Sequence, residues 1–191
     1  MLEVGLGKRE PVQDVARVMP RMADAAIIRT FDHGILEQFS GAATIPVINA
    51  LTDGEHPCQT LADLLTIEES KGSLEGVKVA YIGDGNNVAI SLALGMASTG
   101  KHLTIASPNG YNLPETTEID AVPLNAKSGG SLKLVRDPVD AVKDADIVYT
   151  DVWTSMGQEE ETRIRLEAFK GYQVNPALLD NATSVCMGQR L

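Results

Sequence analysis

Blocks of apolar and polar positions follow one another along the first part of the chain at spacings that predict alternating helices and strands. The short apolar runs are typical of buried parallel strands, and the longer stretches carry apolar residues at helical spacing. The predicted elements are, in order, a helix over residues 8–23, a strand over 24–29, a helix over 34–40, a strand over 45–48 and a helix opening at Pro57, where Leu61, Leu64 and Leu65 recur at helical spacing. This order indicates part of a parallel α/β layer that begins on a helix, without its first strands.

A glycine-rich polar segment, residues 71–76, separates this series from a second one. The second series predicts strands at 77–84, 102–106, 132–135 and 146–151, helices at 87–99 and 138–144, and a partly helical stretch at 114–125. Such β-α repetition is typical of a doubly wound parallel sheet, whose ligands lie outside the carboxyl ends of the strands. We therefore expect an α/β protein with two domains, residues 1–72 and 73–191.

Residues 49–59 are the stretch where an apolar run breaks at Gly54 and a helix begins. Pro57 suits the first helical turn, because the amide that proline lacks would be unpaired there anyway. His56 and Gln59 are therefore expected at the mouth of a helix. Free backbone N–H groups and the helix dipole favour an anion there by roughly 0.3 to 1 kcal/mol, so we interpret this stretch as half of a substrate site.

The composition is that of an ordinary globular chain, with 43% hydrophobic and 22% charged residues among 191. A net charge of −10 argues against nucleic acid or an anionic membrane surface as the main partner. The two cysteines, Cys58 and Cys186, are too few for a disulfide scaffold or a thiolate metal site, which suits a reducing cytoplasm. Neither a secretory signal nor an apolar run approaching about 20 residues is visible, so we expect a cytoplasmic protein with no membrane span.

The turn over residues 83–88 follows a predicted strand and opens a helix, as in dinucleotide-binding proteins. The match is weak, because Val88 replaces the third glycine and the next strand ends on Ile105-Ala106-Ser107 with no acidic residue. A tight turn with asparagine caps is at least as good an interpretation. Both alternatives stay open.

Residues 151–159 place a carboxylate, a hydroxyl and a glycine turn together after a strand, and a carboxylate there can hold an ammonium group. The alternative is a helix start in which Ser155 caps and Glu159 lies in the first turn. Taken singly, Arg29 could do no more than pair with a local acid such as Asp32, and His56 could be an ordinary turn histidine. The chain has no Gly-x-Ser-x-Gly elbow, zinc-type His pair or Gly-Lys-Ser/Thr phosphate loop, so those classes have no support.

Taken together, Arg29, the stretch His56-Pro57-Cys58-Gln59, residues 84–87 and residues 151–157 resemble the ornithine carbamoyltransferases in identity and order. The resemblance runs from Lys8 to about Met187. Related aspartate carbamoyltransferases have threonine where Cys58 stands, and they lack the Ser-Met-Gly found from Ser155.

The resemblance implies two Rossmann-like, three-layer domains with parallel sheets and the active site between them. Residues 1–72 would be the C-terminal part of a carbamoyl-phosphate-binding domain, so the first domain is incomplete. Residues 73–191 would be an ornithine-binding domain without its last elements. The products would be citrulline and phosphate in arginine biosynthesis, with no metal or organic cofactor, and family members are typically trimers through the first domain.

By the same resemblance, residues of the first domain bind carbamoyl phosphate and residues of the second bind ornithine. Arg29 and His56 would donate to the carbamoyl oxygen and Gln59 would accept from the carbamoyl amide, with Pro57 and Cys58 in the same site. The ornithine residues would be Asn87 for the α-carboxylate, Asp151 and Ser155 for the α-ammonium group, and the backbone of Met156.

Two family motifs, a Ser-Thr-Arg-Thr-Arg phosphate loop and a His-Cys-Leu-Pro segment, do not occur in this sequence. We therefore expect weak or absent activity from the chain alone, and self-association through a sheet edge left by missing N-terminal strands. A non-catalytic fragment that retains amino-acid or partner binding is the second hypothesis. A dinucleotide-binding oxidoreductase is the third.

Overall fold

Two parallel strands, β1 (Ala26–Arg29) and β2 (Val47–Leu51), form the sheet of the first of two units in a computed structural model that describes residues 6–73, 75–154, 159–182 and 186–188. The units, Met1–Gln59 and Thr60–Leu191, divide inside helix α3 (Pro57–Lys71), whereas the boundary predicted near Gly72 lies at the far end of that helix. Each unit is described by itself.

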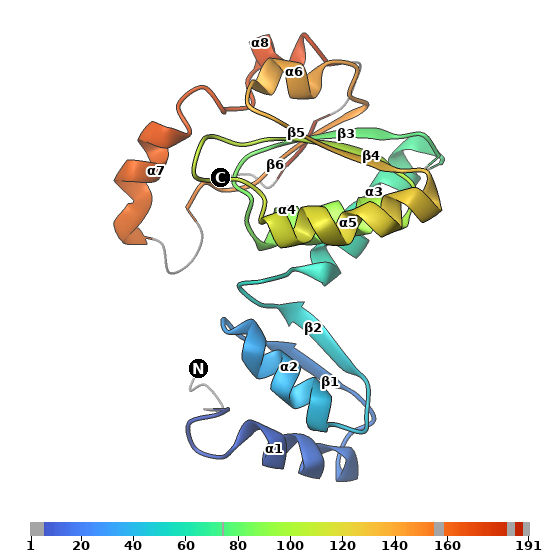
Figure 1. Cartoon of the computed structure of the whole chain (residues 1–191), viewed down its shortest axis with the longest axis vertical. Coiled ribbons are helices and arrows are strands. Elements are labelled where there is room, and N and C mark those ends of the chain that lie inside the picture. The colour runs from blue at the N-terminus through green and yellow to red at the C-terminus, as the bar shows by residue number, and fades with distance from the viewer. Residues whose placement is uncertain (1–5, 74, 155–158, 183–185, 189–191) are drawn as a thin grey trace. The chain divides into compact units, whose positions relative to one another are not determined.

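Helices α1 (Val12–Val18), followed by a 3-10 turn (Met19–Arg21), and α2 (His33–Ala42) accompany the two strands (Figure 1). Their shared core consists of Val12, Ala16, Ala26 and Phe39, all buried. Asp32 starts α2 as its N-cap, because its carboxylate accepts the amide of Gly34 at 2.8 Å. The Asp32 side chain therefore has a structural role at the start of this helix.

The prediction that these strands are buried is wrong for one face of the sheet. Ile27 and Ile48 are register partners on that face, and they are 72% and 42% exposed. The reason is that the core formed with α1 and α2 involves only the other face, with Ala26, Ile28 and Val47. The second strand also continues to Leu51, beyond the end expected from the sequence.

The second unit contains a five-stranded sheet in which all neighbouring strands are parallel, in the order β5-β4-β3-β6-β7. Its strands are β3 (Lys78–Ile82), β4 (His102–Ala106), β5 (Ser131–Val135), β6 (Ile147–Thr150) and β7 (Cys186–Gly188). The chain adds β4 and β5 on one side of β3 and then returns to add β6 on the other. The doubly wound sheet expected from the sequence is confirmed, and its topological switch point lies between β3 and β6.

Helices cover both faces of this sheet (Figure 1). The helices of the second unit are α3, α4 (Asn87–Ser98), α5 (Glu115–Ser128), α6 (Pro138–Val142), α7 (Thr162–Ala168) and α8 (Pro176–Leu179). On one face α3 and α4 contribute Ile67, Leu92 and Met96 to a core with Tyr81, and on the other α6 contributes Val142 to a second core. None of the helices in the described ranges is both long and apolar enough to cross a membrane.

The inward face of α3 differs from the one that leucine spacing suggested. Leu64 is buried as expected, but Leu61 and Leu65 are exposed, and Thr60 and Ile67 complete the buried side. Two leucines four residues apart define a helix face without saying whether that face meets the core. On the buried side of α3, the small Thr60 side chain packs against Gly95 of α4.

Candidate functional site

At the carboxyl ends of β3 and β6, the side chain of Asn86 joins two segments that are far apart in the sequence. Its Nδ2 donates to Oδ2 of Asp151 at 3.1 Å, and its Oδ1 accepts the amides of Val88 and Ala89, both at 3.1 Å. The second pair of bonds makes Asn86 the N-cap of α4. The asparagine-cap interpretation is therefore confirmed, and the same side chain also fixes the carboxylate of Asp151.

The residues expected to bind an amino acid lie at this switch point as far as the structure describes them. Asn87 is the first residue of α4, and Asp151 is the buried residue directly after β6. Asn86 connects the two, although the sequence had suggested only a capping role for it. Ser155 and Met156 lie outside the described residues, and a 3-10 turn at Glu159–Glu161 leads into α7 after them.

Gly85 is required by the approach of another backbone segment. Its amide donates to the carbonyl oxygen of Tyr111 at 2.9 Å. A Cβ atom at this position would lie closer than 3.0 Å to the backbone of Asn112 and Leu113, a separation that real Cβ atoms essentially never show. Chain packing therefore explains this glycine without a dinucleotide ligand.

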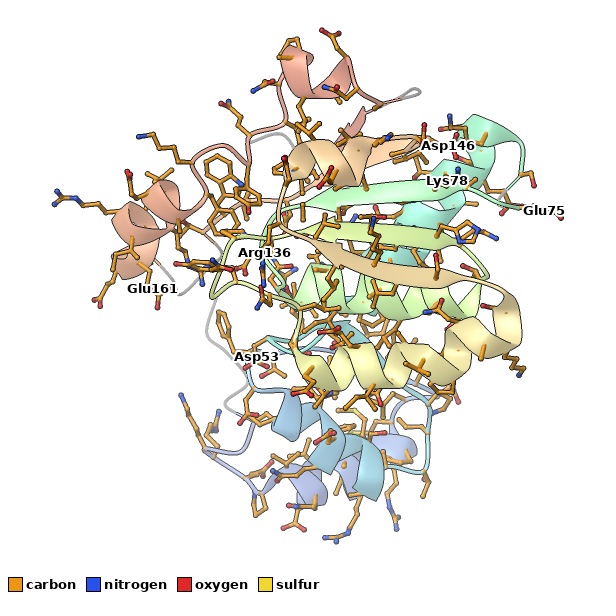
Figure 2. The ribbon with its side chains drawn as sticks, turned by 45° about the horizontal axis from the view of Figure 1, so that its top comes forward. Asp53, Glu75, Lys78, Arg136, Asp146 and Glu161 are labelled. Carbon is orange, nitrogen blue, oxygen red and sulfur yellow. The ribbon has the colours of Figure 1, made fainter. Side chains whose placement is uncertain are left out.

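Arg165 of α7 forms a buried ion pair with Asp84, the residue that opens the same turn. The Arg165 Nη1 to Asp84 Oδ2 distance is 2.6 Å, and the two side chains are 8% and 11% exposed. Nη1 also donates to the carbonyl of Trp153 at 3.2 Å, and Nε donates to Glu161 (labelled in Figure 2) at 3.0 Å. The guanidinium lies 5.0 Å from the centre of the Tyr111 ring, within the range of a cation–π contact. One side chain thus connects four segments.

Burial raises the pKa of Asp84, and the hydrogen bond and charge of Arg165 offset part of that rise. For Arg165, burial alone would lower the pKa, but hydrogen bonds and charge from Asp84 and Glu161 outweigh it, so the pKa is raised. Burial, followed by the charges of Asp151 and Asp84, raises the pKa of the Tyr81 hydroxyl, which donates to the Asp84 carbonyl at 3.0 Å. The guanidinium is therefore the positive charge that opposes the rise in the Asp84 pKa.

Replacing Arg165 with glutamine should make stability fall more steeply as pH rises. A carboxyl whose folded pKa is raised contributes stability that is complete below its ordinary value, 3.8 for Asp84, and is lost as pH rises through the folded pKa. Without Arg165 the Asp84 pKa rises further, so this loss extends to higher pH. Urea unfolding from about pH 5 to about pH 8 measures it. Arg163→Gln, an exposed change on the same helix, is the control; parallel curves for the two variants would contradict the prediction.

Sequence reasoning missed Arg165 because its main partner is 81 residues away. Its spacing of four residues from Glu161 is typical of a helical ion pair, but that signal usually marks an exposed face. Only the tertiary fold brings the Asp84 turn against α7.

The residues expected to hold carbamoyl phosphate lie in the first unit and at the start of α3. Arg29 is the exposed last residue of β1 and the register partner of Leu51, the last residue of β2. His56 directly precedes α3 and is half-buried. Arg29 therefore lies at the carboxyl end of the two strands, and the chain leaves β2 at this same end and continues to His56.

The other predicted carbamoyl phosphate residues form the first turn of α3, as the sequence suggested. Pro57 is the first residue of the helix, and the backbone amide of Gln59 donates to the backbone carbonyl of His56 at 3.1 Å. The exposed thiol of Cys58 donates to the Asn49 carbonyl at 3.3 Å, so it connects the helix start to β2. The helix mouth is thus present, while its ligand remains a prediction.

Thr52, which is fully buried, orders the loop between β2 and His56. Its Oγ1 lies 2.7 Å from Nδ1 of His33, accepts from the Glu55 amide at 3.1 Å and accepts from Nδ2 of Asn49 at 3.3 Å. Gly54 completes the loop, because a Cβ there would lie 3.2 Å from the His33 ring. Neither Thr52 nor His33 was singled out from the sequence, since a lone hydroxyl in a loop carries no pattern.

Thr52→Val should lower the free energy of unfolding of the first unit by about 1 to 3 kcal/mol. Valine keeps the shape of the side chain but removes the hydroxyl that the Glu55 amide, His33 and Asn49 all contact. Hydrogen exchange of the Glu55 amide reports the loss locally. Thr52→Ser retains the hydroxyl and is the matched control. Equal protection of Glu55 in both variants would contradict this role.

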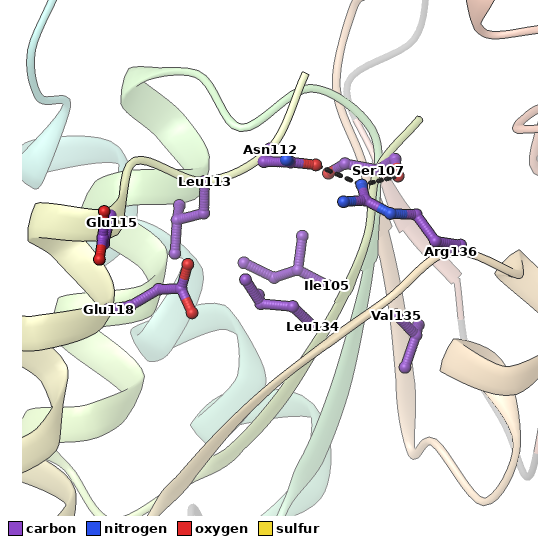
Figure 3. A pocket seen from close by; sticks show the side chains of 9 residues that line it. All are labelled: Ile105, Ser107, Asn112, Leu113, Glu115, Glu118, Leu134, Val135 and Arg136. Atoms are coloured by element: carbon purple, nitrogen blue, oxygen red, sulfur yellow. Dashed lines mark hydrogen bonds between the residues drawn. The ribbon is translucent and has the colours of Figure 1, made fainter. Parts of the chain in front are cut away.

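A cavity of about 520 Å³ lies elsewhere in the second unit, beside β4, β5 and the start of α5 (Figure 3). It is lined by Ile105, Ser107, Asn112, Leu113, Glu115, Glu118, Leu134, Val135 and Arg136, none of which was a predicted site residue. Arg136 donates to the carbonyl of Ser107 at 2.9 Å and to the side chain of Asn112. Within the described ranges, no three His, Cys, Asp or Glu side chains gather closely enough to hold a metal ion.

Two family models match the chain in succession. The carbamoyl-P binding domain of aspartate/ornithine carbamoyltransferase matches residues 2–69, and the Asp/Orn binding domain matches residues 75–187. The stretch between the matches contains Gly72, where the sequence suggested a boundary. The second match includes the turn over residues 83–88 and Asp151.

Curated relatives carry the same family name. Ornithine carbamoyltransferase from Bacillus subtilis is 54% identical over 180 residues, which are 94% of this chain and 56% of the relative. The enzyme of that name from Acidothermus cellulolyticus is 52% identical over 174 residues, 91% of this chain and 56% of the relative. The chain therefore spans about half the length of the curated relatives it matches.

Solved structures agree with these matches. Ornithine carbamoyltransferase from Pyrococcus furiosus superposes with a TM-score of 0.91 at 48% identity, covering 96% of this chain and 59% of that one. Anabolic ornithine carbamoyltransferase from Campylobacter jejuni gives 0.91 at 35% identity, covering 97% and 62%. The order of the two domain matches, the relatives and the shared fold lead to one assignment: this chain belongs to the aspartate/ornithine carbamoyltransferase family.

Proposed function

We propose that the protein containing this sequence transfers the carbamoyl group of carbamoyl phosphate to the δ-amine of ornithine, giving citrulline and phosphate. The observation that carries the proposal is the buried carboxylate of Asp151, held by Asn86 at the switch point of a domain that matches the Asp/Orn binding model. A role in arginine biosynthesis is supported by the Pyrococcus furiosus relative, which is named anabolic.

In this proposal Asp151 binds the α-ammonium group of ornithine. A carboxylate has about four acceptor positions, so the single bond from Asn86 leaves room for further donors. Asn87, at the start of α4, binds the α-carboxylate, where free helix amides and the dipole favour negative charge. Ser155 and the backbone of Met156 complete the proposed amino-acid contacts.

Arg29, His56 and Gln59 hold the carbamoyl group in the proposed reaction, with Pro57 and Cys58 beside them. As the δ-nitrogen attacks the carbonyl carbon, a C–N bond forms and the C–O bond to phosphate breaks, and the departing phosphate takes up the proton that the nitrogen loses. Negative charge grows on the carbamoyl oxygen at the same time. Fixed donors from Arg29 and His56 then stabilise the transition state more than the ground state.

A non-catalytic role is the second candidate, favoured by one sequence observation. Neither Ser-Thr-Arg-Thr-Arg nor His-Cys-Leu-Pro, the two family motifs named above, occurs in these 191 residues. We therefore expect little citrulline formation from these residues alone. The proposed setting is the cytoplasm, and trimerisation is proposed from the family resemblance.

Growth of a bacterial strain that lacks ornithine carbamoyltransferase tests the proposal. The strain would carry a chimera in which this chain replaces the matching 180 residues of the Bacillus subtilis relative. We expect growth without added arginine, and loss of growth with Asp151→Asn, which keeps the size of the side chain but removes its charge. A folded chimera that gives no growth, or an Asp151→Asn variant that grows as well as its parent, would contradict the proposal.

A further inference from the structure

We propose that Arg165 is a positioning residue for the amino-acid half of the site: its guanidinium holds the Asp84 turn and the Trp153 backbone together, and so sets the place of Asp151. This inference rests on the proposed function for its link to ornithine. Its structural part concerns contacts within the second unit alone.

Burying the Arg165 guanidinium costs free energy, and its hydrogen-bond partners indicate which segments the buried charge holds in place. Removing a guanidinium from water is unfavourable unless its donors are paired. Nη1 bonds to both the Asp84 carboxylate and the Trp153 carbonyl, while Nε bonds to Glu161. An ion pair on the surface would avoid this desolvation cost, but it would not hold two buried segments together. The buried Arg165 side chain fixes the Asp84 turn against the Trp153 segment.

The segments joined by Arg165 are those that carry the predicted ornithine ligands. Asp84 lies two residues before Asn86, whose amide holds Asp151, and Trp153 lies two residues after Asp151. Asp151 thus belongs to one of the two segments that Arg165 connects, and its carboxylate is hydrogen-bonded to Asn86 of the other. A shift in the guanidinium would be passed to the Asp151 carboxylate through both segments.

An aromatic cluster makes this arrangement measurable. The Trp153 ring stacks on the fully buried Phe169 ring, with centroids 5.7 Å apart, and Tyr111 meets Phe169 edge-on at 4.9 Å. Trp153 is the only tryptophan in the sequence, so the fluorescence of the chain reports this position directly. The side-chain amide of Asn86 provides a second probe, by NMR, for the bond to Asp151.

The test compares Arg165→Gln with Arg165→Lys, and uses Arg163→Gln as the exposed control on the same helix. In the chain without ligand, we expect Arg165→Gln to shift Trp153 emission to longer wavelength and to move the Asn86 amide resonances, while Arg163→Gln changes neither. Lysine keeps the charge but cannot reach three acceptors as the planar fork does, so Arg165→Lys should give smaller shifts of the same sign. If Arg165→Gln alone does not fold, Asp84→Asn combined with Arg165→Gln removes the unpaired buried carboxylate and should show the same shifts.

Titration with ornithine, in the presence of carbamoyl phosphate and followed by Trp153 emission, connects the positioning to binding. We expect half-saturation at about 10-fold or more higher ornithine in Arg165→Gln, by analogy with loss of residues that orient a ligand group, and partial rescue in Arg165→Lys. Unchanged emission and Asn86 resonances in folded Arg165→Gln or in the double variant would overturn the inference, as would unchanged half-saturation. If the parent chain shows no ornithine response while the emission and resonance shifts occur, the proposed ornithine site fails and the structural role of Arg165 stands.

Discussion

Gly85→Ala is expected to lower the free energy of unfolding by about 3 kcal/mol, near the upper end of the usual range for overpacking. The new Cβ would lie closer than 3.0 Å to backbone atoms of Asn112 and Leu113. A backbone segment cannot move aside as a flexible side chain can, and this segment is tied to Gly85 by the amide bond to Tyr111. The turn or the 111–113 segment must shift, which also disturbs Asn86. Urea unfolding followed by circular dichroism measures the change.

Gly41→Ala is the matched control for this prediction. Gly41 lies in α2, and a Cβ there would meet no atom within 4 Å. Alanine favours a helix over glycine by roughly 0.5 to 1 kcal/mol, so this variant should be slightly more stable than the parent. Equal stability of Gly85→Ala and the parent would contradict the prediction that the backbone of Asn112 and Leu113 excludes a side chain at this position.

His56→Ala is expected to lower kcat for citrulline formation by about 10²- to 10³-fold in the Bacillus subtilis chimera, the usual cost of removing one donor to a developing oxyanion. His56 directly precedes α3, and in the proposed reaction it donates to the carbamoyl oxygen. The expected loss is in kcat more than in KM, because the charge on that oxygen grows in the transition state.

Another histidine, His102, provides the control. His102 lies at the start of β4, at the opposite end of the sheet strand from the switch point, and its Nδ1 lies 2.9 Å from the Ser131 hydroxyl. His102→Gln should keep the kcat of the parent within about two-fold, as expected of a change outside the proposed site. A His56→Ala variant that is as active as His102→Gln would remove His56 from the proposed mechanism.

Much of the second unit could be predicted from its sequence because its local patterns agree with its tertiary structure. The strands at 77–84 and 102–106 appear as β3 and β4, and the helix expected from residue 87 is α4. Buried strands between amphipathic helices give a strong periodic signal. By contrast, the three residues of β7 are too few for a pattern, and Pro123 inside α5 obscured a complete helix.

Sequence patterns could not show which apolar faces find a partner. Ile27 and Leu61 have the spacing of core residues but are exposed, because burial depends on what packs against an element. Long-range polar contacts were missed for a similar reason. Arg165 and Asp84 are ordinary charged residues until the fold brings them together, and Asn86 was expected as a cap without its bond to Asp151.

The most direct test of the proposed function is citrulline formation by the purified chimera, with carbamoyl phosphate and either ornithine or aspartate as the acceptor. We expect citrulline from ornithine, no carbamoyl transfer to aspartate, and a loss of activity in Asp151→Asn that appears mainly in the KM for ornithine. A folded chimera that carbamoylates aspartate, or that makes citrulline equally well with Asp151→Asn, would contradict it.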